Sequence, residues 1–125
     1  MTSKRELYYC KLCGNVLEVV FKGATPLICC GEEMQLLVAK SGDEGKEKHR
    51  PVVETAGSGV LVKVGSIEHP MTDEHFIAFI EVMTASTVHR AELNPGEKPQ
   101  AEFPVSEAAI VEVRAYCNVH GAWKR

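Results

Sequence analysis

Residues 109–121 read AIVEVRAYCNVHG, and this stretch decides how the larger part of the chain is expected to fold. Apolar and polar side chains alternate through residues 109–116, which predicts a β-strand. Cys117 and His120 follow the predicted strand, and Gly121 comes after them. Two metal-binding side chains therefore lie in a loop at the edge of a rigid element, which is a common way to build a site.

Other strands are predicted upstream of this one. Val60, Val62 and Val64 share one parity, as one face of a strand requires. Residues 76–83 form a largely apolar run, and residues 87–93 alternate imperfectly. Turn signals separate these runs at Gly57-Ser58-Gly59, Asn94-Pro95-Gly96 and Pro99. Since no stretch keeps a helical period, this part of the chain is predicted to be an all-β sandwich or barrel.

Composition sets the outer bounds. The 125 residues are 45% hydrophobic and 25% charged, which is typical of a soluble globular protein. The net charge is -3 with mixed signs, so no broad basic surface for nucleic acid is expected. No apolar run approaches the roughly 20 residues that cross a bilayer, and the N-terminus leads into no signal-peptide core. We expect neither a nucleic-acid partner nor a membrane.

Two domains are predicted, residues 1–38 and residues 39–125. The first contains four of the five cysteines, with short strands expected at residues 8–9, 16–21 and 36–38. It has too few large apolar side chains for a core of its own, so a metal is the expected staple. Residues 40–50 are polar and contain glycines, which predicts a linker and an exposed loop.

The cysteines predict metal ligation. An odd count in a chain without a secretion signal favours metal binding over disulfides, and a reducing cytoplasm is the expected compartment. Cys10-Lys11-Leu12-Cys13 is a knuckle that brings two thiolates to one ion, and four thiolates suit iron or zinc. Cys29 and Cys30 are adjacent, so a local turn is needed to bring both to that ion. Two alternatives remain for this cluster. The metal ion could only stabilise the fold, without taking part in chemistry, or the cysteines could be free structural residues.

A second cluster is rich in histidine. Each of its members lies at or near a loop signal: His49, His69, His75, Cys117 and His120. Four imidazoles and one thiolate exceed the tetrahedral need of structural zinc and suit a metal with five or six positions, such as iron. The alternative is that these are ordinary solvated histidines. His89 lies inside a predicted strand and is assigned no role.

Five motifs together resemble those of desulfoferrodoxin, the two-iron form of superoxide reductase. The resemblance spans essentially the whole chain, and its motifs occur in order: Cys10-x-x-Cys13, Cys29-Cys30, Glu47-Lys48-His49-x-Pro51, His69-Pro70-Met71-x-x-x-His75 and Cys117-Asn118-x-His120-Gly121. It implies a desulforedoxin-like iron domain followed by an immunoglobulin-like β-sandwich that holds a second iron. Arg50 fills the variable position of the third motif.

The resemblance also implies ligands and roles. One iron would be bound by Cys10, Cys13, Cys29 and Cys30. The other would be bound by His49, His69, His75 and His120 in a plane, with Cys117 on the axis. The implied activity is one-electron reduction of superoxide to hydrogen peroxide, with a rubredoxin-like donor and a homodimeric assembly. Lys48 would attract superoxide and orient a proton-donating water, and Glu47 would displace the product.

Electrostatics gives an independent expectation for such a site. Superoxide is a small anion, so its site should be exposed and locally positive although the whole chain is acidic. Two other functions compete with this interpretation. One is an iron electron carrier without enzymatic activity, and the other is a zinc-stabilised interaction module. Binding of azide or cyanide would identify an open metal position, and the colour of the protein would distinguish iron from zinc.

Overall fold

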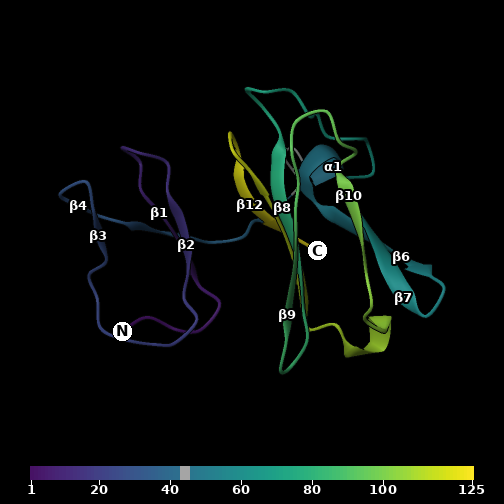
Figure 1. Cartoon of the computed structure of the whole chain (residues 1–125), viewed down its shortest axis with the longest axis horizontal. Coiled ribbons are helices and arrows are strands. Elements are labelled where there is room, and N and C mark those ends of the chain that lie inside the picture. The colour runs from purple at the N-terminus through teal and green to yellow at the C-terminus, as the bar shows by residue number, and fades with distance from the viewer. Residues whose placement is uncertain (43–45) are drawn as a thin grey trace. The chain divides into compact units, whose positions relative to one another are not determined.

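The computed structural model describes residues 1–42 and 46–125, so the part of the predicted linker at residues 43–45 lies outside the described residues. The chain divides into two units, Met1–Val38 and Ala39–Arg125, and each is described by itself (Figure 1). The regular structure of both units is almost entirely β, as the sequence predicts. Among the described residues, no helix is long and apolar enough to cross a membrane.

The N-terminal unit contains two small antiparallel sheets. Strands β2, β1 and β5 pair in that order, and β3 pairs with β4 in a hairpin. Their bounds are Leu7–Tyr9 for β1, Val16–Glu18 for β2, Ile28–Cys29 for β3, Glu32–Glu33 for β4 and Gln35–Leu37 for β5. Tyr8, Cys10 and Met34 form a small buried cluster in this unit, and Leu7 is buried as well. So small a core agrees with a unit that needs a staple.

The strand predicted over residues 16–21 is shorter than expected. β2 ends at Glu18, and Val19 continues with only two irregular hydrogen bonds, to the backbones of Arg5 and Glu6. Arg5 has a φ of 72°, which is left-handed rather than extended. Because the neighbouring segment of the same chain leaves the extended conformation at Arg5, the hydrogen-bond ladder between the two strands stops at this point.

The C-terminal unit is a sandwich of two antiparallel sheets. One sheet has the order β10-β7-β6, and the other has the order β12-β11-β8-β9. The first contains β6 (Pro51–Ala56), β7 (Gly59–Val64) and β10 (Gln100–Phe103). The second contains β8 (Ile77–Met83), β9 (Val88–Glu92), β11 (Glu112–Cys117) and β12 (Gly121–Lys124). This arrangement confirms the predicted immunoglobulin-like sandwich.

The core lies between the two sheets. Val60, Val62 and Val64 are no more than 1% exposed, which confirms the predicted parity of their strand. They belong to one buried cluster with Ile80 and Val113 from the opposite sheet. These β-branched side chains suit a pleated surface buried on one face.

Three parts of this unit differ from the sequence-based expectation. The strand predicted over residues 109–116 begins only at Glu112, because a 3-10 turn (η1, Glu107–Ala109) precedes it and the Ile110 amide donates to the Glu107 carbonyl. One turn of helix, α1 (Lys46–His49), forms where a loop was expected. Strands β10 and β12 were not predicted.

The strand register brings distant segments to one end of the sandwich. Pro51 at the start of β6 pairs with Val64 at the end of β7. Cys117 at the end of β11 pairs with Ile77 at the start of β8. The segments that precede β6 and β8 and follow β7 and β11 therefore meet there, and these segments contain all the predicted histidine ligands.

Candidate metal centres

Two hairpin turns build the cysteine cluster. The first turn carries Cys10 and Cys13 and is closed by a 2.8 Å hydrogen bond from the Gly14 amide to the Cys10 carbonyl. Gly14 has a φ of 84°, a conformation that costs glycine little. The amide of Cys10 donates to the Asn15 carbonyl across the same turn. Both cysteines therefore project from one tight, hydrogen-bonded loop.

The second turn explains how adjacent cysteines reach one point. Cys30 and Gly31 join β3 to β4 and have positive φ angles of 54° and 76°. Two central residues with positive φ are the signature of a type I′ hairpin turn, whose twist matches that of the flanking strands. Since Cys29 ends the strand and Cys30 begins the turn, their side chains no longer point to opposite sides. Their sulfurs lie 4.0 Å apart.

The cysteine cluster fits a tetrahedral metal. The four sulfurs of Cys10, Cys13, Cys29 and Cys30 all lie within 4.8 Å of one another. Metal–sulfur bonds of about 2.3 Å imply sulfur–sulfur edges of about 3.8 Å in a tetrahedron. The separation between the sulfurs of Cys13 and Cys29 is 3.5 Å, and that between Cys29 and Cys30 is 4.0 Å.

Charge also favours a cation in the cysteine cluster. Hydrogen bonds from the backbone at Cys13 lower the pKa of Cys10 to about 7. Side-chain hydrogen bonds with the neighbouring thiols, Cys13 first, raise the pKa of Cys30 to about 12, because they favour the protonated thiol. A bound metal ion would take the place of the protons that these thiols share, since thiolates rather than thiols are metal ligands.

Four imidazole rings form the second cluster. The centroids of His49, His69, His75 and His120 are separated in that order by 4.7, 4.7 and 5.0 Å, and His120 lies 4.7 Å from His49. The distance between His49 and His75 is 6.4 Å, as expected for a diagonal. Neighbouring rings are inclined by 70–82°. The four rings thus lie like the corners of a square, with their edges facing its centre.

The nitrogens have the spacing that a metal requires. His49 Nε2 lies 3.0 Å from His120 Nδ1. Metal–nitrogen bonds of about 2.1 Å imply edges of about 3.0 Å for adjacent ligands in a square. Nε2 atoms of His69 and His75 are buried without a hydrogen-bond partner among the described residues. Buried polar atoms usually have hydrogen-bond partners, so these two nitrogen atoms indicate that an ion binds between the histidines.

Cys117 approaches the square from the protein core. Its side chain is fully buried and belongs to the hydrophobic core cluster. Its sulfur lies within 4.8 Å of the ligand atoms of His49, His69 and His75, and 3.8 Å from His120 Nδ1. The sulfur therefore occupies the core side of the square, and the opposite side faces away from the core. The ligand atoms of His49, His69, His75 and Cys117 thus lie together, and His120 is placed beside two of them by its contacts with His49 and Cys117.

The surroundings favour the neutral form of two imidazoles, those of His69 and His75. Burial lowers the pKa of His69 to about 4, and burial with the charges of His120 and Lys48 lowers the pKa of His75. His69 Nδ1 lies 2.6 Å from the Pro70 carbonyl oxygen and donates to it, which leaves Nε2 as a lone-pair donor. Burial raises the pKa of Cys117, and backbone amides of His120 and Val119 oppose that rise.

Helix α1 places Glu47 and Lys48 beside the histidine cluster. Both side chains are exposed. The helix packs closely on Gly65: a Cβ atom there would overlap the Glu47 carbonyl oxygen and lie 2.8 Å from the carbonyl carbon of Lys48. The Ile67 amide donates to that same Glu47 oxygen at 2.7 Å. Only glycine therefore permits this approach, and sequence reasoning missed it.

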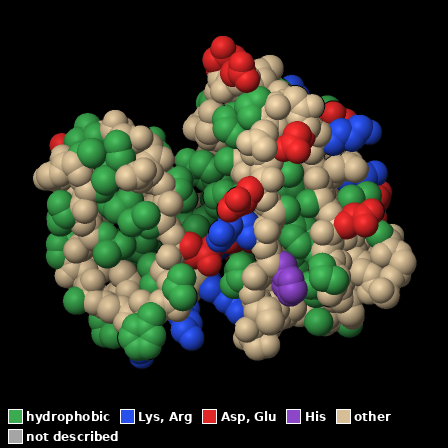
Figure 2. Space-filling model, in the orientation of Figure 1, with side chains coloured by type: hydrophobic (Ala, Val, Ile, Leu, Met, Phe, Trp, Pro, Cys, Tyr) green, Lys and Arg blue, Asp and Glu red, His purple; other side chains and the backbone are tan. Residues whose placement is uncertain are grey.

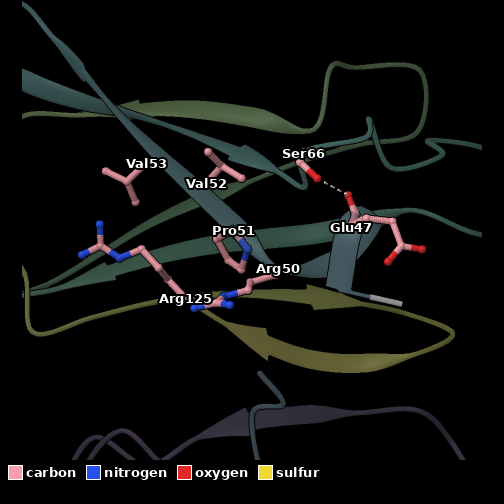
Figure 3. A pocket seen from close by; sticks show the side chains of 7 residues that line it. All are labelled: Glu47, Arg50, Pro51, Val52, Val53, Ser66 and Arg125. Atoms are coloured by element: carbon pink, nitrogen blue, oxygen red, sulfur yellow. Dashed lines mark hydrogen bonds between the residues drawn. The ribbon is translucent and has the colours of Figure 1, made fainter. Parts of the chain in front are cut away.

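A pocket of about 440 Å³ borders α1 and β6 (Figure 3). Arg50 and Arg125 are among its lining residues, and Arg125 also pairs with Glu107 at 3.6 Å. Ser66 donates to the Glu47 carbonyl at its other end, while the Glu47 carboxylate points away from the two arginines. Lys48 and Arg50 directly flank His49 in the chain, so two cations lie beside this histidine.

Two supporting residues were missed by sequence reasoning. The ring of Trp123 stacks on His49 at 4.9 Å and 20°, and its Nε1 donates to the His120 carbonyl at 3.3 Å. Lys40 Nζ donates to the same carbonyl at 2.9 Å. The position of Trp123, three residues after a histidine ligand, was the available signal. His89 lies apart from the cluster on β9, where its Nε2 contacts the Thr87 hydroxyl at 3.1 Å.

Comparison with known proteins agrees with this geometry. The desulfoferrodoxin family model matches residues 41–125, and the model of the desulfoferrodoxin N-terminal domain matches residues 2–37. A desulfoferrodoxin homolog of Methanothermobacter thermautotrophicus is 50% identical over 98% of this chain and 99% of its own length. One from Archaeoglobus fulgidus is 51% identical over 99% of this chain and 98% of its own length.

A solved structure extends the similarity to the fold. The crystal structure of the superoxide reductase from Treponema pallidum matches with a TM-score of 0.79 and 30% identity, covering 96% of each chain. Both units thus match domain models of one family, and the chain belongs to the desulfoferrodoxin family.

Proposed function

We propose that this chain is a superoxide reductase, an enzyme that gives one electron to superoxide and forms hydrogen peroxide. The observation that carries this proposal is the square of four imidazoles with the buried Cys117 sulfur on its core side. Such a set leaves the side away from the core available to a small ligand, which a saturated structural site would not do. The similarity to the superoxide reductase of Treponema pallidum supports the same conclusion.

We assign one iron to each cluster. Cys10, Cys13, Cys29 and Cys30 would hold the first in a desulforedoxin-like domain, residues 1–38. The second would be held in the sandwich domain, residues 39–125, by His49, His69, His75, His120 and Cys117. Soft thiolates and borderline imidazoles both suit iron. When bound, the iron of the second centre supplies the electron that reduces superoxide.

The side chains around the second centre have separate tasks. Neutral imidazoles leave the positive charge of the centre largely uncompensated, and Lys48 adds to it, so the anionic substrate is attracted. The Cys117 thiolate donates electron density, which favours loss of an electron at this centre. Lys48 is also assigned to orient a water that donates a proton, and Glu47 to displace the product. Each turnover takes one superoxide, one electron and two protons, and gives one hydrogen peroxide.

The stoichiometry of the reaction tests this function. The full-length, iron-loaded protein is reduced, exposed to a measured flux of superoxide, and assayed for peroxide and dioxygen. A reductase forms one hydrogen peroxide for each superoxide consumed and releases no dioxygen. One peroxide with one dioxygen for every two superoxide ions would mean dismutation, and no consumption above the background rate would refute the proposal.

A non-enzymatic electron-transfer protein is the second candidate function. The observation that favours it is the exposure of Cys13 and Cys30, which brings the cysteine cluster to the surface. Electron carriers usually saturate their metals, so azide or cyanide should leave the spectrum of the ferric histidine centre unchanged if this candidate is correct. A spectral shift on adding either anion supports the reductase.

We also propose a homodimer, a rubredoxin-like electron donor and a cytoplasmic location. Seven large apolar side chains of the N-terminal unit are 46–81% exposed: Leu12, Leu17, Val20, Phe21, Ile28, Leu36 and Val38. Figure 2 shows hydrophobic side chains spread over the visible face of this unit. So much exposed apolar surface on a small unit supports an interface between two copies. All five cysteines are free of disulfides, which supports a reducing compartment.

A further inference from the structure

Asn118 lies in the chain between two proposed ligands of the histidine centre, Cys117 and His120. It follows the last residue of β11, where the chain turns away from the sheet towards β12. Asn118 is exposed, so its side chain is not part of the packed core. Its hydrogen bonds instead point to the segment that carries His75.

Three hydrogen bonds join Asn118 to that segment. Its backbone amide donates to the Phe76 carbonyl at 3.2 Å. Its side-chain Oδ1 accepts from the Phe76 amide at 2.9 Å, and its Nδ2 donates to the Glu74 carbonyl at 3.0 Å. The bonded groups lie on the residues directly before and after His75, so the backbone on both sides of this histidine is held.

We propose that Asn118 is a positioning residue that fixes the His75 ring relative to Cys117. β8 begins only at Ile77, and the register shifts between Tyr116 and Cys117, so the regular strand ladder no longer constrains Glu74 or His75. The carboxamide of Asn118 extends the ladder by offering an acceptor and a donor, as a peptide group would. It thereby couples the turn that carries two ligands to the loop that carries a third.

The chemistry of the contact selects a carboxamide. Aspartate keeps the acceptor for the Phe76 amide but cannot donate to the Glu74 carbonyl, and its charge would repel that oxygen. Serine is too short to span both groups. Residues that orient a metal ligand commonly contribute 10- to 100-fold to metal affinity, because a loosely held ligand loses entropy each time it binds.

The test uses the full-length, iron-loaded protein and the substitution Asn118→Asp. Asn94→Asp is the matched control, because it makes the same chemical change at an exposed turn position of the same unit. Two properties are measured: the rate at which a chelator removes iron from the histidine centre, and the absorption and electron-paramagnetic-resonance spectra of that centre in its ferric state. Asn118→Asp should release iron about 10- to 100-fold faster and alter both spectra, while Asn94→Asp should match the parent.

Other outcomes would overturn the proposal. If Asn118→Asp matches Asn94→Asp in iron release and in both spectra, Asn118 does not position His75. A lower melting temperature with unchanged spectra and release would mean a purely structural role. If Asn118→Asp does not fold, Asn118→Ser is judged by the same measurements. The proposal rests on the proposed iron centre but uses no superoxide assay, so a failure of the reductase activity would be recognised separately.

Discussion

The cysteine cluster and the histidine cluster are built in opposite ways. Two short hairpin turns bring Cys10, Cys13, Cys29 and Cys30 together, and a small cluster of buried residues supports them. The histidine cluster draws its ligands from the ends of strands in both sheets of a sandwich with a much larger core. The first is therefore expected to depend on its metal for folding, whereas the second is formed by a fold that can exist without it.

Cys10→Ala should produce the largest effect. Cys10 is both a proposed ligand and a member of the small buried cluster of its unit, so the metal and the folded N-terminal unit should be lost together. Iron content should fall from about two to about one per chain, with the spectrum of the histidine centre retained. Lys11→Ala changes an exposed neighbour and should keep both irons. Loss of both centres in Cys10→Ala would show that the two units are not independent.

Cys117→Ser is the converse experiment. It should weaken iron binding at the histidine centre and change its colour, because the buried thiolate is replaced by a poorer donor. The sandwich should stay folded, since its core does not depend on the metal. Metal analysis and absorption spectra of the purified variant are the measurements. An unchanged spectrum and unchanged superoxide reactivity of the histidine centre would contradict the role assigned to Cys117.

Gly65→Ala should disturb the histidine centre by displacing helix α1, although Gly65 itself is not a proposed ligand. The added Cβ would force α1 away from the loop after β7, and with it His49 and Lys48. Overpacking of this kind destabilises by about 1–3 kcal/mol, which thermal or denaturant unfolding would measure. Gly42→Ala has nothing within 4 Å of its added Cβ and serves as the control. Equal stability of the two variants would mean that α1 is not held by this contact.

Lys48→Ala should have the smallest effect, confined to the rate of substrate capture. The rate constant for superoxide should fall on the order of 10-fold at low ionic strength and depend less on salt, since a steering charge has been removed. Lys63→Ala removes a lysine from β7, where it pairs with Glu54 at 3.1 Å, and should leave the rate unchanged. The steering role is wrong if Lys48→Ala reacts at the parental rate in low salt.

Some of this organisation could be predicted from the sequence because it is periodic or closely spaced. The alternation of Val60, Val62 and Val64 predicted a strand, and the structure buries all three. The Cys-x-x-Cys spacing likewise predicted a knuckle. The need for a turn at the adjacent cysteines was also clear, and Cys30 and Gly31 provide it with positive φ.

Other features depend on contacts between distant residues and have no local pattern. The approach of α1 to Gly65 arises only when the loop after β7 folds back onto the helix. The stacking of Trp123 on His49 joins the last strand to the segment before β6. The buried ion pair between Glu81 and Arg114, with a 2.7 Å separation, joins β8 to β11 and was not anticipated. Tertiary structure, rather than propensity, decides each of these.

The metal content of the full-length protein from iron-replete cells tests the difference between the two clusters most directly. The geometry predicts about two irons per chain, one with the spectrum of a four-thiolate centre and one with that of the histidine centre. One iron in the histidine centre and one zinc in the cysteine cluster would keep the enzyme and reduce the N-terminal unit to a staple. Zinc alone, with no activity after reconstitution with iron, would contradict the proposed function.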